Sequence, residues 1–303
     1  MGAPRSGRPF FSLASFLITL IAMDSRKKPA RTYSCEFFPP KTEQGRANLS
    51  TTIDELGQLK PAYFSCTYGA GGSTQDGTTD TVKEILRKGF AAAPHITCIG
   101  STPEKIKTLL DSYIALGIKR IVALRGDLPA GQDQAGHFLY ANQLVAFIRQ
   151  QTGDHFHIEI AAYPEKHPQA ASIQEDLRHF KKKADAGANA AISQYFFNPD
   201  AYFRFVDDCA QLGVTIPIVP GIMPITNYKQ LARFSEGCGA EIPRWIAARL
   251  EGYGEDLDAI RAFGLEVTLR LCETLLARGA PGLHFYTLNR TEPTRAIWQQ
   301  LGL

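Results

Sequence analysis

Residues 95–124 read HITCIGSTPEKIKTLLDSYIALGIKRIVAL, and this stretch decides the fold. Its first run, His95–Ile99, is apolar and suited to a buried strand. Thr102-Pro103-Glu104 then places a capping hydroxyl before a proline at the first helical position. Gly117 follows the helical stretch, where a left-handed residue commonly ends a helix, and Arg120–Leu124 is a second apolar run. This order predicts two parallel strands joined by a helix.

The same unit recurs from residue 32 to the C-terminus. Asn198-Pro199-Asp200 repeats the helix start, and Gly187 and Gly213 repeat the helix end. Eight strands with helices between them favour one domain of the α/β class, a closed (β/α)8 TIM barrel, although the count alone leaves an open sheet possible. Ile222–Pro281 is longer than one unit needs and predicts two or three helices, of which Ala259–Ala277 is the clearest. The expected strands are Tyr33–Phe38, Tyr63–Tyr68, His95–Ile99, Arg120–Leu124, His157–Ala162, Ala190–Phe196, Ile216–Pro220 and Leu283–Thr287.

The composition fits a soluble globular protein. Of 303 residues, 44% are apolar and 21% charged, and the net charge is +3. Residues 1–31 hold six basic side chains and one acidic one, so the rest of the chain carries a net charge of −2. That balance offers no basic face to a nucleic acid. The six cysteines form no CxxC pair, which indicates a reducing, cytoplasmic setting.

The first 31 residues differ from the rest. Pro9–Met23 is apolar and has basic residues on both sides, but it is shorter than the roughly 20 residues of a membrane span. It resembles the apolar region of a signal peptide without a small-residue cleavage site, and MGAPRS fits a myristoylation pattern. Translation from Met23, or a poorly ordered extension, is favoured over membrane insertion. We therefore expect an apolar and basic extension over residues 1–31, a catalytic barrel over 32–303 and no stable membrane association.

Polar residues follow the ends of the predicted strands, where a barrel of this type gathers its functional groups. This convergence predicts an active site at the carboxyl ends of the strands. His155–Glu159 offers metal ligands on alternate residues, but it lies at the beginning of a strand, and we expect no metal there. The residues at strand ends are Glu36, Thr67, His95, Arg125-Gly126-Asp127, Tyr163, His167, Gln194 and Tyr286–Arg290.

Short motifs at these strand ends resemble methylenetetrahydrofolate reductases, from about Tyr33 to the C-terminus. They are CEFFPPK (35–41), SCTYGAGG (65–72), APHITC (93–98), VALRGDLP (122–129), AAYPEKHP (161–168), DAGANAAISQYFF (185–197) and HFYTLNR (284–290). The resemblance implies a (β/α)8 barrel that binds FAD without a Rossmann domain. GAGGST at 69–74 agrees, because its spacing is not that of a dinucleotide fingerprint. The length implies the catalytic barrel alone, without the adenosylmethionine-binding domain of eukaryotic members.

The activity implied by the resemblance is reduction of 5,10-methylenetetrahydrofolate to 5-methyltetrahydrofolate. NADH or NADPH, which the sequence does not distinguish, would reduce the flavin, and the flavin would reduce the folate, in support of methionine synthesis. A homo-oligomer is implied as well. Alternatives are another FAD-dependent barrel enzyme of the proline dehydrogenase type, or a non-catalytic barrel subunit. A Schiff-base aldolase is less favoured, because Gln194 stands where a nucleophilic lysine would be needed.

Two carboxylates carry the catalytic roles that the resemblance implies. Glu36 would protonate N10 of the folate as a general acid. Its neighbours Phe37 and Phe38 suggest desolvation, which would raise the pKa of Glu36 and keep it protonated near neutral pH. A buried salt bridge is the alternative. Asp127 would place a negative charge beside the flavin, which favours hydride donation and the cationic iminium of the folate. A structural capping role for Asp127 is its alternative.

The remaining positions match cofactor and substrate contacts of the family. Arg125 and Lys183 are suited to the phosphates of FAD. His179 stands where a well-known bacterial pattern has Asn, which leaves its contact with FAD open. The other implied FAD contacts are Thr67, His95, Gly126, Asp127, Tyr140, Ala141, Tyr163, His167 and Asp176. The implied substrate contacts are Glu36, Gln194, Gln230, Phe234, Tyr286, Leu288 and Arg290.

Overall fold

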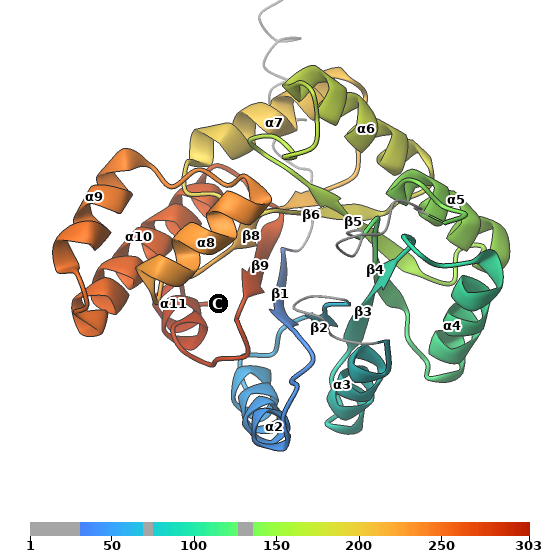
Figure 1. Ribbon diagram of the computed structural model, residues 1–303, viewed down its shortest axis with the longest axis horizontal. Coiled ribbons are helices and arrows are strands. Elements are labelled where there is room, and N and C mark those ends of the chain that lie inside the picture. Colours follow the sequence, from blue (N-terminus) through green and yellow to red (C-terminus); the bar gives the residue numbers. More distant parts are fainter. Residues whose placement is uncertain (1–30, 69–74, 127–135) are drawn as a thin grey trace, which may run out of the picture. The chain divides into compact units, whose positions relative to one another are not determined.

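Parallel strands form a single ring of neighbours in the computed structural model, which describes residues 31–68, 75–126 and 136–303. Every strand pairs in parallel with its neighbours, in the order β7-β6-β5-β4-β3-β2-β1-β9-β8. Helices surround the strands (Figure 1). The prediction of a (β/α)8 barrel is therefore confirmed. The strands are β1 (Thr32–Phe37), β2 (Tyr63–Cys66), β3 (Ala92–Thr97), β4 (Arg120–Leu124), β5 (His157–Ala162), β6 (Ala190–Ser193), β7 (Ile218–Val219), β8 (Gly221–Ile222) and β9 (Gly282–Tyr286).

The ring closes through the segment that was expected to form one strand at Ile216–Pro220. Pro220 divides it into β7 and β8, because proline has no backbone N–H to donate to a neighbouring strand. Ile218 and Val219 pair with β6, whereas Gly221 and Ile222 pair with β9. The two pieces thus occupy one strand position and join the two edges of the sheet.

Local signals place the helices as expected. Thr102 caps its helix by accepting from the Lys105 N–H at 3.3 Å, and Asn198 accepts from the Asp200 N–H at 3.0 Å. Three helices occupy the long segment after β8, as predicted. The helices are α2 (Glu43–Gly57), α3 (Gln75–Arg87), α4 (Pro103–Ala115), α5 (Ala141–Thr152), α6 (Ile173–Asp185), α7 (Pro199–Gln211), α8 (Tyr228–Cys238), α9 (Arg244–Tyr253), α10 (Leu257–Ala277) and α11 (Thr294–Gln300). Within the described ranges, none of them is long and apolar enough to cross a bilayer.

Alternate residues of a strand face either the surrounding helices or the interior of the barrel. Successive side chains of a strand point to opposite faces. On β1, Cys35 and Phe37 belong to the large apolar cluster shared with the surrounding helices. Ser34 and Glu36 point the other way, into the barrel. Several buried polar side chains of the strands, among them Ser34, Ser65, His95, Thr97, Glu159 and His284, give the barrel a polar interior that positions the site.

Candidate active site

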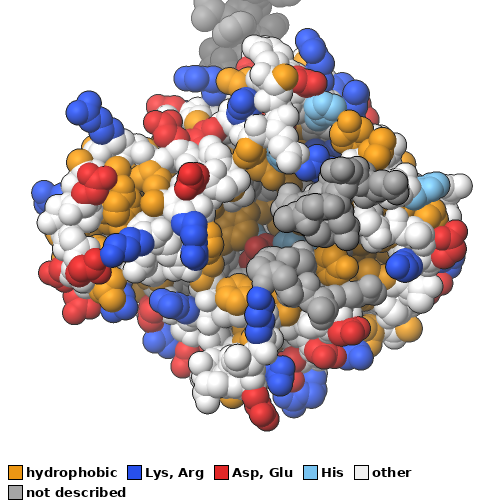
Figure 2. All heavy atoms as spheres, viewed as in Figure 1, with side chains coloured by type: hydrophobic (Ala, Val, Ile, Leu, Met, Phe, Trp, Pro, Cys, Tyr) orange, Lys and Arg blue, Asp and Glu red, His pale blue; other side chains and the backbone are white. Residues whose placement is uncertain are grey.

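Glu36 is the centre of a polar cluster inside the barrel. Its Oε2 lies 3.2 Å from Nε2 of His95 on β3 and 3.3 Å from Nε2 of His284 on β9. The Ser65 hydroxyl on β2 donates to the same oxygen at 3.3 Å. Nε2 of His95 has no hydrogen-bond partner among the described residues, so its contact with Glu36 is chiefly electrostatic. Figure 2 shows a hollow near the centre of one face, where acidic and histidine side chains are visible among apolar ones.

The pKa of Glu36 depends on burial and on its two imidazole neighbours. Burial raises the pKa, but the electrostatic and hydrogen-bonding contributions of His95 and His284 outweigh burial and lower the pKa of Glu36 to about 2. The expectation of a raised pKa from Phe37 and Phe38 is therefore wrong. Phe37 points outward into the helix-covered cluster, so the side chains that surround the carboxylate are imidazoles and not phenyl rings.

His284 and Ser65 were not identified from the sequence as site residues. His284 is fully buried and lies two residues before Tyr286, on the same strand face. That alternation could have indicated His284, because Tyr286 was already assigned to the substrate site. Ser65 is the register partner of Glu36 on β2, a relation that only the strand pairing reveals.

The loop after β9 is tied to the end of β1. The Asn289 side chain accepts from the Phe38 N–H at 3.0 Å and donates to the Phe38 carbonyl at 2.8 Å. The Thr287 hydroxyl donates to the carbonyl of Glu36 at 2.7 Å. Leu288 and Asn289 both adopt left-handed backbone conformations, with φ of 53° and 58°. Leu288 and the exposed Arg290 therefore lie on a loop whose position is fixed relative to Glu36.

Several expected FAD contacts lie where the strands end. The Thr67 hydroxyl oxygen is buried and has no hydrogen-bond partner within the described residues. Gly126 has φ of +82°, and a Cβ there would lie 2.9 Å from Cβ of Thr97. The Arg125 guanidinium donates to the Gln169 side chain. Asp127 lies outside the described residues.

A second group of expected FAD contacts comes from α5, α6 and the loop after β5. The Tyr140 and His179 rings stack with centroids 5.9 Å apart, and Ala141 begins α5. The Tyr163 and His167 rings form a T-shaped contact with centroids 4.5 Å apart. Asp176 on α6 accepts from the His167 backbone N–H at 2.7 Å, which holds the loop after β5 against the helix.

Lys183 points inward from α6. Its ammonium group donates to the Ala161 carbonyl on β5 at 2.6 Å. Burial lowers the pKa of Lys183 from its ordinary value of 10.5 to about 8, with the negative charge of Asp176 opposing the shift. A half-buried cation at Lys183, an unpaired buried hydroxyl at Thr67 and a close backbone turn at Gly126 fit an anionic cofactor such as FAD.

The lowered pKa of the half-buried Lys183 predicts a pH-dependent stability of the ligand-free protein. Because the folded state releases this proton near pH 8 and the unfolded state only near 10.5, folding stability should rise between these pH values. Urea unfolding of the ligand-free protein at pH 7 and pH 10 measures the change. Lys183→Met should remove part of the rise, and Lys182→Met, on the exposed side of the same helix, should keep it. An equal rise in all three proteins would contradict this prediction.

The expected substrate contacts approach the barrel from two directions. Gln194 follows β6, and its Oε1 accepts from the Tyr195 N–H. The Tyr286 hydroxyl donates to the Ser193 carbonyl at 2.8 Å, across the closing segment of the barrel. Gln230 and Phe234 are one helical turn apart on α8, and Phe234 packs against a second apolar cluster. The structure thus brings Glu36, His95 and Tyr286 together at the barrel interior, whereas Gln230 and Phe234 come from a separate helix.

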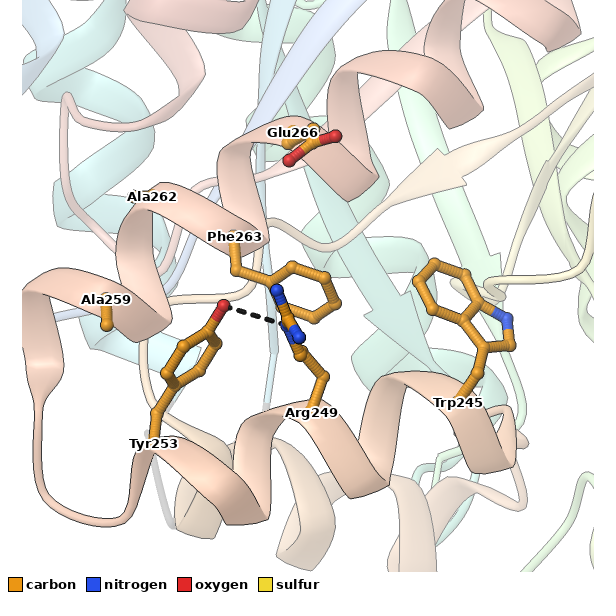
Figure 3. A pocket seen from close by; sticks show the side chains of 7 residues that line it. All are labelled: Trp245, Arg249, Tyr253, Ala259, Ala262, Phe263 and Glu266. Carbon is orange, nitrogen blue, oxygen red and sulfur yellow. Dashed lines mark hydrogen bonds between the residues drawn. The ribbon is translucent and has the colours of Figure 1, made fainter.

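Two cavities lie apart from Glu36. One of about 530 Å³ lies between α9 and α10 on the outside of the barrel; its lining includes Trp245, Arg249 and Phe263 (Figure 3). The other, of about 240 Å³, is lined by Tyr163, Asp176 and residues of α6 and α7. Among the described residues, no group of three or more His, Cys, Asp or Glu side chains could hold a metal ion. Glu159 instead pairs with Arg120 at 2.7 Å.

Comparison with known proteins agrees with the resemblance seen in the motifs. The family model for methylenetetrahydrofolate reductase matches residues 22–302. The 5,10-methylenetetrahydrofolate reductase of Escherichia coli is 42% identical over 271 residues, which are 89% of this chain and 90% of that protein. Methylenetetrahydrofolate reductase (NADH) 1 of Arabidopsis thaliana is 40% identical over 285 residues, 89% of this chain and 48% of that protein.

One solved structure shares the fold. A Clostridium thermocellum protein described as binding two copies of 5-methyl-5,6,7,8-tetrahydrofolic acid superposes with a TM-score of 0.64 and 17% identity, covering 90% of this chain and 96% of that one. The match of the family model over nearly the whole chain and the identity to the bacterial enzyme lead to the same conclusion. The chain belongs to the methylenetetrahydrofolate reductase family.

Proposed function

We propose that the barrel, residues 32–303, reduces 5,10-methylenetetrahydrofolate to 5-methyltetrahydrofolate with FAD as cofactor and NADH or NADPH as reductant. The observation that carries the proposal is the placement of Glu36, a carboxyl group inside the barrel beside two imidazoles. Family membership supplies the reaction class. We further propose a two-step exchange, in which NAD(P)H leaves before the folate binds, and a role in methionine synthesis.

Opening of the folate's bridging ring requires a proton at N10. An amine nitrogen leaves far more readily once it is protonated, and the carbon that remains is an electrophilic iminium. Glu36 would deliver this proton to N10 together with the imidazoles of His95 and His284, which lie within 3.3 Å of its Oε2 and offer a path by which a proton can reach the carboxylate. When bound, FAD supplies the hydride that reduces this carbon. Asp127 would favour the cationic iminium by its negative charge.

The remaining side chains bind and orient. Lys183 and Arg125 would neutralise the phosphates of FAD, and the Thr67 hydroxyl would gain a partner from it. Gln194 and Gln230 would pair with the folate ring, whose edge offers both donors and acceptors. Phe234 and Tyr286 would border the ring, and Arg290 would bind a carboxylate. Tyr140, Ala141, Tyr163, His167, Asp176 and His179 would complete the FAD site.

The purified protein is expected to be yellow and to release FAD, not FMN, on denaturation. The half-buried Lys183 ammonium group and the unpaired Thr67 hydroxyl both favour an anionic cofactor at this end of the barrel. Absorbance of the native protein and chromatography of the released flavin check the prediction. Anaerobic NADH should bleach the flavin, and methylenetetrahydrofolate should restore the colour. A flavin-free protein that cannot be reconstituted with FAD would overturn the proposed function.

A further inference from the structure

A buried hydrogen bond between Tyr195 and Ser235 joins α8 to the segment that follows β6. The two hydroxyl oxygens are 3.0 Å apart, and the residues are 3% and 7% exposed. Tyr195 comes directly after Gln194, and Ser235 comes directly after Phe234. The bond therefore connects two segments that carry expected contacts with the substrate.

Both hydroxyls lie in surroundings that otherwise favour apolar side chains. Tyr195 belongs to the second apolar cluster together with Phe197 and Leu231, and its ring contacts the Phe197 ring with centroids 6.0 Å apart. Serine inside a helix is less favourable than alanine, and a buried hydroxyl without a partner costs free energy. Phenylalanine and alanine would fill the same space without any polar atom. The hydrogen bond that the two hydroxyls make with each other explains why they are there.

Other polar contacts hold α8 mainly to its neighbour α9. In the part of the chain that the structure describes, the Tyr228 hydroxyl and the Lys229 ammonium group bond to carboxylates on α9 and in the turn after it, at 2.9 and 2.6 Å. Beyond the C-terminal end of α8, the Glu241 N–H donates to Glu165 on the loop after β5 at 2.7 Å. The bond of Ser235 joins α8 itself to the end of a barrel strand.

Tyr195 also contacts the residue on the other side of the expected substrate site. Its backbone N–H donates to Oε1 of Gln194 at 3.0 Å, and the Gln194 N–H donates to the Ala162 carbonyl on β5 at 2.7 Å. Gln194 is therefore held by the barrel and does not follow α8 if the helix shifts. The separation of Gln194 from Gln230 and Phe234 then depends on how α8 is held.

We propose that Tyr195 and Ser235 are positioning residues for the substrate: their hydrogen bond holds α8 at the separation from Gln194 that the folate ring requires. The inference rests on the proposed function, in which Gln194 and Gln230 pair with that ring and Phe234 borders it. Both hydroxyls are buried, so they act through the helix. A helix that is held in place before the substrate arrives need not be ordered during binding, which increases affinity.

Hydrogen–deuterium exchange of the protein as purified, without substrate, tests the tether. In Tyr195→Phe the backbone amides of Tyr228–Cys238 should exchange about fivefold faster, because α8 loses a hydrogen bond of ordinary strength to the barrel. Tyr202→Phe is the matched control. It removes an equally buried hydroxyl, which donates to the Ile218 carbonyl at 2.6 Å, and should leave the exchange of α8 unchanged. Unchanged exchange of α8 in Tyr195→Phe would overturn the inference.

The concentration dependence of the folate half-reaction tests the consequence for the substrate. In stopped flow, Tyr195→Phe should raise the half-saturating concentration of methylenetetrahydrofolate about five- to tenfold and keep the limiting rate within about twofold of wild type. A variant that was only less well folded would instead lose flavin or limiting rate. Ser235→Ala should have the same effect as Tyr195→Phe, and the double variant should have no larger one, because both substitutions break one bond. Additive effects would contradict the proposal.

A second comparison identifies α8 as the element that is positioned. In a background that lacks both proposed ring contacts of α8, Gln230→Ala with Phe234→Leu, the change Tyr195→Phe should raise the half-saturating concentration less than about twofold further. In Arg290→Ala, on the loop after β9, its full effect should persist. An equal loss in both backgrounds would assign Tyr195 a general structural role and refute the inference. Because the exchange measurement needs no turnover, a protein inactive toward folate would disprove the proposed function, while the exchange of α8 would still decide whether the tether exists.

Discussion

Glu36→Gln is expected to slow the folate half-reaction by at least about 100-fold while leaving flavin reduction by NADH near its wild-type rate. General acid catalysis typically contributes about 10²–10⁴ in rate. The glutamine keeps the size of the side chain but has no carboxylic proton to give. Hydride transfer from nicotinamide to flavin needs no proton delivered to a substrate. Stopped-flow absorbance of the flavin measures the two half-reactions separately.

The nicotinamide half-reaction serves as the internal control for this variant. If Glu36 were only a structural partner of His95 and His284, the variant would lose stability or flavin, and both half-reactions would suffer together. Flavin content and thermal unfolding of the variant distinguish that outcome. A stable, flavin-loaded variant that reduces the folate at the wild-type rate would refute the role of Glu36 as an acid.

Gly221→Ala is expected to destabilise the barrel by about 3 kcal/mol or more, because it adds volume where the barrel closes. A Cβ at Gly221 would lie 2.1 Å from the Ser193 carbonyl oxygen and 2.6 Å from the Tyr286 ring. Neither can move freely, since the Tyr286 hydroxyl donates to that same carbonyl. The melting temperature should fall by roughly 6–12 °C, as scanning calorimetry would measure.

Gly237→Ala is the matched control for this change. Gly237 lies in α8, and nothing stands within 4 Å of a Cβ placed there. Alanine loses less backbone freedom on folding than glycine, so this variant should be more stable by roughly 0.5–1 kcal/mol. Equal effects of the two substitutions would show that crowding at the closing segment is unimportant.

The starts of the helices could be predicted from the sequence, because residues that are neighbours in the chain determine them. A capping hydroxyl before a proline fixes a helix start within a few residues, as at Thr102 and Asn198. The division of the closing strand at Pro220 was not predicted, since the sequence analysis expected one strand there, although the missing N–H of proline explains it afterwards. Which neighbour each half pairs with depends on the curvature of the whole barrel.

The candidate site could be predicted less completely, because part of it depends on contacts between residues that are far apart in the chain. Motifs at strand ends identified Glu36 and the loop to Arg290, because strand ends converge in a barrel. The ionisation of Glu36 could not be predicted, since it depends on His95 and on His284, the second of which lies 248 residues away in the chain. The adjacent phenylalanines misled the prediction because adjacency along a strand places side chains on opposite faces.

The double hydrogen bond between Asn289 and the backbone of Phe38 has a consequence for redesign. It fixes the segment that carries Glu36 to the segment that precedes Arg290, so the two segments form one structural unit. A loop transplanted from another barrel to alter substrate choice would lose these hydrogen bonds unless residues 36–40 and 286–290 were exchanged together. Substitutions at Gln230 and Phe234 on α8 are therefore the simpler route to altered specificity, because they leave this unit intact.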